Sequence, residues 1–433
     1  MGISFSGGFD YGYFGWVVDL NTGNEVSQRR FKLRDSISTV SNVIVSDGDF
    51  VSSYSEDSKI RAQKYFWALQ LSKSTKNYSE IARQINEPNR TVHGWLSEGQ
   101  TPWGIKGANK LKNANLLPLV ADGSPHFKLF VEIFAFVLGD GTIGKDFSGV
   151  GLTGEKEDLE KLKRKIEANF GFTTELEKRE TTSVTKKEIK GRHFTQNIVG
   201  SSYYLRIHSS PFARLLHLAG APKGDKVVQS FKLPIWILNA PKEIKRDFLG
   251  VLFGNELQCP NIRAKNAFTS PQFGMHKVEG KEEAIVYFLN QLKDLLNEFG
   301  ISSSKVCLDR SYKTIRKDGL ISKKFYFGLD SHSPNIVRLF NEVPFKYASE
   351  KKARFADKVE QFFENSKHLQ NEWEIYEKVM QMHSSGIGRR KIYKQLGLPK
   401  AYFYKINSWV HYGKKPLYYG ELDIPETVVK GMM

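Results

Sequence analysis

The sequence has very few cysteines and no long apolar stretch, and both absences limit what the protein can be. Only Cys259 and Cys307 occur, which is too few for a disulfide framework or a cysteine-based zinc site. No window approaches the roughly 18 uninterrupted apolar residues of a membrane-spanning helix. The first residues also lack the positively charged start of a signal peptide. We therefore expect a soluble cytoplasmic protein.

An excess of acidic residues is also absent. The 433-residue chain carries 64 Lys and Arg against 47 Asp and Glu, a formal net charge of +17. Such a chain is attracted to polyphosphates, because neutralising each phosphate releases condensed counterions. Its length allows two to four domains. The position of the basic residues decides whether the charge favours solubility or nucleic-acid binding.

Two apolar segments end in a carboxylate at the same distance after a proline. The first runs from Pro125 to Asp140 and contains IFAFVLGDG, and the second runs from Pro241 to Glu256 and contains LGVLFGNEL. Each predicts a buried helix with an acid at its C-terminal end. A carboxylate there opposes the helix macrodipole. Two such helices packed side by side would bring the acids together, which indicates a metal site.

The elements that follow each acid are also duplicated. An apolar-periodic helix ends before Gly171 in the first half and before Gly300 in the second, and glycine is the expected C-terminal cap. A basic hairpin, an aromatic strand and a short helix follow in both. The basic residues are Lys178, Arg179, Lys186, Lys187, Lys190 and Arg192 in the first half, and Arg310, Lys313, Arg316, Lys317 and Lys323 in the second. We predict that they follow a DNA backbone; ordinary loop charge is the alternative.

A further repeat lies outside the central segment. Four residues of 81–88 recur at identical offsets in 392–399, and each copy closes with Trp-[Leu/Val]-x-x-Gly-x-x-Pro. A short helix, a tight turn and a second amphipathic helix form a helix-turn-helix, whose second helix can lie in the major groove. The groove-facing candidates are Asn89, Arg90 and His93 in the first copy, and Lys400, Tyr404 and Lys405 in the second. A packed helical hairpin without a DNA role is the alternative.

The two acid-ended segments resemble the paired signature helices of the LAGLIDADG homing endonucleases, in the double-motif single-chain form. The resemblance covers a little over half of the chain. It implies an α+β core of two pseudo-two-fold-related halves with saddle-shaped sheets, acting as a monomer on double-stranded DNA. In that family the terminal acids share divalent ions, usually Mg²⁺, which implies that Asp140 and Glu256 are metal ligands and catalytic residues.

The resemblance also implies roles for residues around the acids. Small residues at the contact between the helices would be Ala135, Gly139, Gly250 and Gly254. Cleaving members tend to have a lysine near the site, for which Lys305 and Lys324 are the candidates. The second motif departs from the family, with Asn255 where a small residue is preferred and Leu257 where glycine is preferred. These departures weaken the expectation of cleavage more than that of DNA binding.

The sequence therefore predicts four regions and one leading function. A β-rich segment of unknown role covers 1–57, a helix-turn-helix domain 58–120, the double-motif core 121–365 and a second helix-turn-helix domain 366–433. The ends lack the residues for intein splicing, so we expect a free-standing or already excised protein. Its expected activity is that of a site-specific endonuclease that cuts DNA with Mg²⁺. A non-cleaving transcriptional regulator and, less favoured, an intron RNA maturase are the alternatives.

Overall fold

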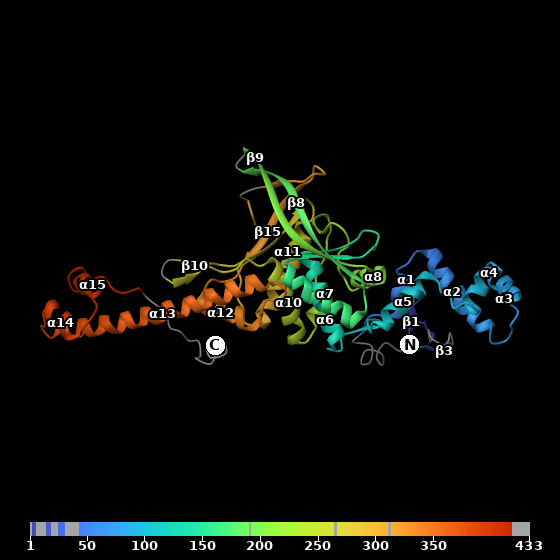
Figure 1. Cartoon of the computed structure of the whole chain (residues 1–433), viewed down its shortest axis with the longest axis horizontal. Coiled ribbons are helices and arrows are strands. Elements are labelled where there is room, and N and C mark those ends of the chain that lie inside the picture. Colours follow the sequence, from blue (N-terminus) through green and yellow to red (C-terminus); the bar gives the residue numbers. More distant parts are fainter. Residues whose placement is uncertain are drawn as a thin grey trace.

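The computed structural model describes residues 2–5, 14–18, 25–30, 43–189, 192–263, 266–310 and 313–417. The molecule is elongated, with a mixed α/β core at its centre and a helical unit at each end (Figure 1). The predicted mixture of helices and antiparallel strands is confirmed at this level. Among the described helices, none is long and apolar enough to cross a membrane.

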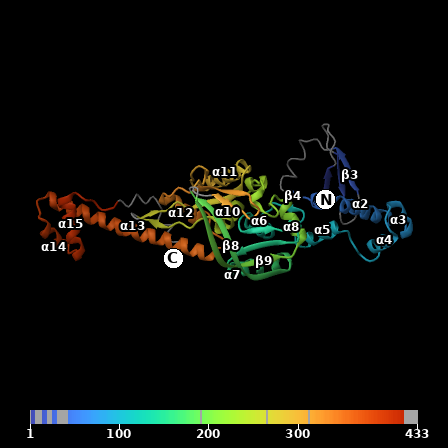
Figure 2. The same ribbon diagram turned by 90° about the horizontal axis from the view of Figure 1, so that it is seen from above.

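The two acid-ended segments form neighbouring helices at the centre of the core. Helix α6 spans Pro125–Leu138 and helix α10 spans Lys242–Glu256, and the two pack against each other. Helix α6 starts at Ser124, whose hydroxyl accepts a hydrogen bond from the Phe127 amide at 3.2 Å, a standard N-cap. Helices α7 (Lys156–Phe170) and α11 (Glu282–Glu298) lie on opposite sides of this pair (Figure 2). The signature helices thus lie between the two helices that follow them in the sequence.

The strands of both halves join in one antiparallel sheet. Its strands are β6 (Gly141–Ile143), β7 (Val150–Gly154), β8 (Thr174–Ile189), β9 (Arg192–Ile207), β12 (Gln272–Val278), β13 (Cys307–Leu308), β14 (Lys313–Ile315) and β15 (Ile321–Gly328). The order is β12-β15-β14-β8-β9-β7-β6, with β13 paired to β15. The halves meet where Lys313 of β14 opposes Glu188 of β8. We expected a sheet in each half, and this pairing instead makes them continuous.

Short elements connect the two halves and close each of them. Helices α8 (Ser210–Leu218) and α12 (Ser333–Glu342) end the halves. Between α8 and α10 lie the 3-10 helix η1 (Lys226–Val228) and helix α9 (Ile235–Leu238). A small hairpin of β10 (Ile262–Arg263) and β11 (Ala267–Phe268) follows α10. The connection that carries η1 thus lies between the end of the first half and the second signature helix.

The described part of the N-terminal region contains both strands and helices. Strands β1 (Gly2–Phe5), β2 (Phe14–Val18) and β3 (Glu25–Arg30) form an antiparallel sheet. Strand β4 (Val43–Val45) pairs with β5 (Leu119–Val120), and helices α1 (Asp47–Ser52) and α5 (Trp103–Asn113) pack into the main core through Phe50 and Leu111. The predicted boundary after residue 57 falls within helix α2, so it does not separate structural units.

A three-helix unit occurs at each end of the molecule. The N-terminal unit consists of α2 (Glu56–Leu71), α3 (Tyr78–Ile85) and α4 (Asn89–Leu96), and the C-terminal unit of the end of α13 (Ser349–Ser384), α14 (Arg389–Gln395) and α15 (Lys400–Tyr412). A tyrosine of the long helix meets a tryptophan edge-on in both: Tyr65 and Trp95 at 5.6 Å, Tyr376 and Trp409 at 5.5 Å. Both units therefore place a long helix and two further helices in the same order and share this aromatic contact.

Helix α13 is continuous from the core to the C-terminal unit. Its Phe355 and Phe362 belong to the main core, whereas Val379 belongs to the small core of the C-terminal unit. The predicted domain boundary at residue 365 therefore falls inside a helix that links the two cores. At 1.5 Å per residue, the 36 residues of α13 span about 54 Å.

A crossover segment, residues 344–348, clamps the paired helices. Its Lys346 Nζ lies 2.8 Å from Glu132 Oε1 of α6 and 2.5 Å from Asp247 Oδ1 of α10. The Tyr347 hydroxyl donates to the second oxygen of Glu132 at 2.5 Å. Burial opposes ionisation of Glu132, but hydrogen bonds from Lys346 and Tyr347 lower its pKa below the ordinary value. The cation of Lys346 thus bridges both helices.

Gly250 and Gly254 allow the crossover segment to approach α10. A Cβ atom added at Gly250 would lie 2.6 Å from the carbonyl oxygen of Pro344, and one at Gly254 would lie 2.6 Å from that of Lys346. Both glycines therefore face the crossover segment. The prediction that they line the contact with the first signature helix is wrong, because a third chain segment occupies their side of α10.

We expect Gly254→Ala to lower the free energy of unfolding by about 1–3 kcal/mol, because the methyl group would collide with a backbone oxygen in a packed interior. Gly104→Ala of α5 is the control: its added Cβ would find its nearest neighbour at 3.6 Å, an ordinary contact, and alanine favours a helix interior. Urea unfolding measures both. Unchanged stability of Gly254→Ala would contradict the close approach.

Candidate active site at the foot of the paired helices

The two predicted acids lie where the signature helices end. Asp140 follows Gly139, the C-cap of α6, and Glu256 is the last residue of α10. A Cβ atom added at Gly139 would lie 3.3 Å from Asn255 Cβ and 3.4 Å from Glu256 Cγ. Gly139 therefore faces α10 and lets the helix ends approach closely. Ala135, one turn earlier on α6, is completely buried.

Two lysines cap these helix ends. Lys226 of η1 donates hydrogen bonds to the carbonyl oxygens of Val137 at 3.1 Å and Leu138 at 3.2 Å, and also to Gly139. Lys351, on the first turn of α13, donates to the carbonyl oxygens of Gly254 and Asn255, the latter at 2.8 Å. A cation at a helix C-terminus satisfies orphan carbonyls and offsets the negative end of the macrodipole. Each signature helix thus has its own lysine cap.

The carboxylates and lysines perturb one another. Burial and the neighbouring charge of Asp140 raise the pKa of Glu256 to about 7, against the opposing effect of Lys226 and Lys351. Asp140 keeps a face open to solvent, but the protein atoms around its carboxylate displace water and raise its pKa too. Burial lowers the pKa of Lys226 and of Lys351, although both carboxylates work in the other direction.

The predicted lysines, Lys305 and Lys324, are not the ones that act on the acids. Lys305 is exposed in the segment before β13, and the Lys324 ammonium of β15 lies 5.8 Å from the centre of the Tyr326 ring. The charges felt by both carboxylates are those of Lys226 and Lys351. This part of the site prediction is therefore corrected.

The sequence places both capping lysines after a similar motif in the two halves. Each half closes with a short helix followed by an apolar residue and proline: Ala221 and Pro222 in the first half, Val343 and Pro344 in the second. In each half a lysine that follows this proline, Lys226 or Lys351, donates to the end of a signature helix. The two lysines stand at different distances from their prolines, so the match is one of order and not of spacing.

Asn255 leaves an unsatisfied donor at this point. Its side-chain Nδ2 is buried and has no hydrogen-bond partner, and it would lie 3.3 Å from a Cβ atom at Gly139. A buried unpaired amide costs about 1–3 kcal/mol. Asparagine is larger than a small residue such as glycine, so its amide must either push the helices apart or find a partner. In the structure it fits against glycine without finding one.

The donor set suits a hard divalent cation only with help from a substrate. Among the described residues, no group of three or more His, Cys, Asp or Glu side chains is arranged to hold a metal. Asp140 and Glu256 supply two carboxylates, and oxygen ligands are what Mg²⁺ prefers. Mg²⁺ usually binds one or two carboxylates and completes its shell with waters and phosphate oxygens. Burial raises the pKa of both carboxylates, and the charge of Asp140 adds to the rise at Glu256. The residues fit an ion of this kind, which would stabilise their charged forms.

The predicted DNA-contacting residues of the first hairpin lie along β8 and β9. Lys178 and Arg179 are exposed on β8, where Arg179 pairs with Glu177 and its guanidinium lies 3.3 Å from the centre of the Tyr204 ring. Lys186, Lys187 and Arg192 belong to the strand ends near the tip. Lys190 is outside the described residues. This hairpin projects from the body of the core (Figure 1).

The second hairpin carries both unpaired and paired cations. Arg310, Lys313 and Lys317 are exposed. By contrast, Lys323 pairs with Glu279 at 2.9 Å. Arg316 pairs with Asp225 and, at 3.0 Å, with Asp318, and its side chain is only 20% exposed. Arg316 is therefore engaged inside the protein, which corrects its prediction as a free DNA contact.

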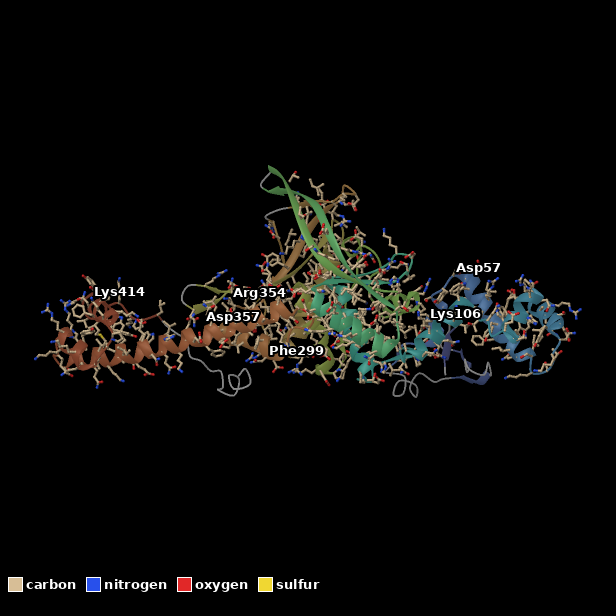
Figure 3. The ribbon with its side chains drawn as sticks, viewed as in Figure 1. Asp57, Lys106, Phe299, Arg354, Asp357 and Lys414 are labelled. Atoms are coloured by element: carbon tan, nitrogen blue, oxygen red, sulfur yellow. The ribbon has the colours of Figure 1, made fainter. Side chains whose placement is uncertain are left out.

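The predicted DNA-contacting residues of the terminal units also include both exposed and ion-paired side chains. Asn89, Arg90 and His93 are exposed on α4, although Nδ1 of His93 lies 3.1 Å from Glu98. On α15, Lys400 and Tyr404 are exposed. Lys405 of that helix pairs with Glu372 of α13 at 2.7 Å, so it is held against α13 rather than free as predicted. The terminal cation Lys414 and Lys106 of α5 lie on opposite sides of the core (Figure 3).

Several curated proteins are similar to part of this chain, although no family model matches it. A tRNA-splicing ligase RtcB of Pyrococcus furiosus is 30% identical over 263 residues, which are 59% of this chain and 25% of the relative. The RNA polymerase subunit Rpo1N of Methanocaldococcus jannaschii is 30% identical, over 57% of this chain and 18% of its own. The replication factor C small subunit of the same organism is 24% identical, over 52% and 12%. The chain thus spans a quarter or less of these relatives.

Solved structures with some likeness are those of the homing endonuclease I-DmoI. Its mesophilic variants are 12% identical, over 52% of this chain and 96% of theirs, with a TM-score of 0.29. The complex of I-DmoI with DNA and Ca is 10% identical, over 50% and 88%, with a TM-score of 0.26. At these scores the likeness carries no argument, so the predicted family remains a prediction.

We expect Glu256→Gln to stabilise the metal-free protein above pH 7. Because the folded-state pKa of about 7 exceeds the ordinary value, the wild type loses stability as pH rises from about 4.5 to about 7. The glutamine variant lacks this loss and should be more stable at pH 8 by about 1–3 kcal/mol, with the difference vanishing below pH ~4.5. Urea unfolding with a chelator present measures it, and a pH-independent difference would contradict the raised pKa.

Proposed function

We propose that the protein is a site-specific endonuclease that hydrolyses phosphodiester bonds in double-stranded DNA with a divalent cation. The observation that carries the proposal is the meeting of Asp140 and Glu256 at the ends of two packed helices, each capped by a lysine. Nothing in a purely structural role requires two acids beside the negative ends of two helix macrodipoles. A cation shared with a DNA phosphate compensates that charge.

The residues of the site have distinct roles in this proposal. Asp140 and Glu256 hold the cation, which when bound activates water and neutralises charge at the scissile phosphate. Lys226 and Lys351 keep the helix ends in place and place positive charge beside the phosphate. Gly139 keeps the acids close, since a side chain there would press on Asn255 and Glu256. The charged form of Glu256 must predominate for metal binding, so activity should rise through pH 7.

DNA binding in the proposal rests on the basic hairpins and the terminal units. The net charge of +17 and exposed cations of both hairpins supply non-specific attraction. The exposed faces of α4 and α15 would read additional base pairs in the major groove. With one unit at each end of an elongated molecule (Figure 1), the protein would act as a monomer on a long site.

The shared segment in the curated relatives supports a self-contained activity. A ligase, a polymerase subunit and a replication factor subunit each contain a stretch similar to this chain over less than a third of their length. Proteins with such different names have no common reaction, so the shared stretch does not carry any one of theirs. We attribute to it an activity of its own, and the RNA ligase reaction is not part of the proposal.

A non-cleaving DNA-binding regulator is the second candidate. The observation in its favour is the orphaned amide of Asn255, which lies at the foot of the helices where a small residue would pack better. An RNA-binding maturase has no comparable observation behind it.

The first test selects bound duplexes from a random DNA library and then adds Mg²⁺. We expect cleavage by the wild type and its loss, by at least about 100-fold, in Asp140→Ala and Glu256→Ala, with binding retained. Glu360→Ala, an exposed acid of α13, is the control and should cleave normally. Binding without cleavage under any divalent cation would favour the regulator, and a strong preference for structured RNA would favour the maturase.

The second test concerns the lysine caps. We expect Lys226→Met and Lys351→Met each to slow cleavage, because a buried positive charge next to the scissile phosphate is lost; single charged groups of this kind are worth roughly 10²–10³-fold in rate. Lys352→Met removes the exposed neighbouring lysine and should have no such effect. Single-turnover cleavage rates make the comparison. Full activity of both cap variants would remove the lysines from the mechanism.

A further inference from the structure

We infer that Lys277 and Arg316 of the second half, together with Asp225, are positioning residues that hold Lys226 at the two carboxylates. This inference rests on the proposed function. It assigns a role to a buried lysine and an internal ion pair that the proposed reaction does not otherwise use. The residues lie on the second-half sheet and on the connection that carries η1.

Lys277 holds the backbone of the segment that bears Lys226. It lies on β12, its residue is only 2% exposed, and its ammonium donates to the carbonyl oxygens of Lys226 and of Gln229, the latter at 2.6 Å. The same ammonium lies 4.0 Å from the centre of the Phe231 ring. A buried cation is tolerated only where its hydrogen bonds are satisfied. Lys277 therefore fixes both ends of η1.

Asp225 and Arg316 form the second anchor. One carboxylate oxygen of Asp225 accepts a hydrogen bond from the Val227 amide at 2.9 Å and so caps η1. The other oxygen pairs with the Arg316 guanidinium. Arg316 follows β14 directly, at the turn of the second hairpin. A bidentate-capable guanidinium gives such a pair a defined geometry.

These contacts cross between the halves. Lys226 follows the first half in sequence and caps the first signature helix, yet it is held from the second-half sheet. Arg316 lies between the exposed cations Lys313 and Lys317, which are predicted to touch the DNA backbone. The cap of the first signature helix is therefore held in part by residues of the second half.

Two matched pairs of variants test the inference. Asp225→Asn keeps an oxygen to cap η1 but removes the charge that holds Arg316, whereas Asp318→Asn removes the other carboxylate on Arg316 without touching η1. Lys277→Met removes the second anchor, and Lys293→Met of α11 is its control. We expect the single-turnover rate to fall roughly 10- to 100-fold in Asp225→Asn and Lys277→Met, as for residues that orient a site from behind. DNA affinity and the control variants should not change.

A protein-only measurement accompanies cleavage. Lys226 should react faster with an amine-specific acylating reagent in Asp225→Asn and Lys277→Met than in the wild type, as read by mass spectrometry of the folded proteins. Supercoiled substrate should also accumulate nicked circles, because only one of the two lysine caps is loosened. Wild-type rates together with unchanged Lys226 labelling would overturn the inference. If the wild type cleaves no DNA, the proposed function fails, whereas labelling still decides the positioning role. If Lys277→Met does not fold, Asp225→Asn decides it.

Discussion

The architecture depends on two helix C-termini meeting at one point. Each terminus presents unpaired carbonyl oxygens, and each is followed or closed by a carboxylate, so four negative groups converge at the foot of α6 and α10. The protein opposes this accumulation with Lys226 and Lys351, which donate into the carbonyls themselves. Burial of the carboxylates nevertheless raises the pKa of both acids, and the charge of Asp140 adds to the rise at Glu256.

The middle of the same helices is stabilised by different means. There the crossover segment places Lys346 between Glu132 and Asp247, and the pKa of Glu132 falls below its ordinary value. Glu132 thus has a directly bound lysine that favours its charged form, whereas the pKa values of Asp140 and Glu256 at the helix ends are raised. The contrast arises from which residues return to the helices after each half. The return of the crossover segment also accounts for Gly250 and Gly254, which lie on the face of α10 that meets it.

The sequence predicted the elements that repeat and failed where distant segments meet. Asp140 and Glu256 were found because each ends an apolar segment at the same spacing after proline, and the terminal units because their offsets match. Lys226 and Lys351 were missed because their closeness to the acids is set by how the chain returns after α8 and α12. Gly250 and Gly254 were placed on the wrong contact because a small residue does not reveal which neighbour it admits. The joining of β14 to β8 depends on strand register, which no local pattern encodes.

Because α13 is continuous, its length fixes how the C-terminal unit is rotated relative to the core. Each residue of an α-helix turns its successors by about 100° and advances them 1.5 Å. The number of residues in α13 therefore sets the direction in which the exposed face of α15 points relative to Asp140 and Glu256. A DNA duplex has its own pitch of about 10 base pairs. Insertions into this helix would consequently change which side of the duplex the C-terminal unit faces, and only lengths that suit both pitches would be compatible with a single bound site.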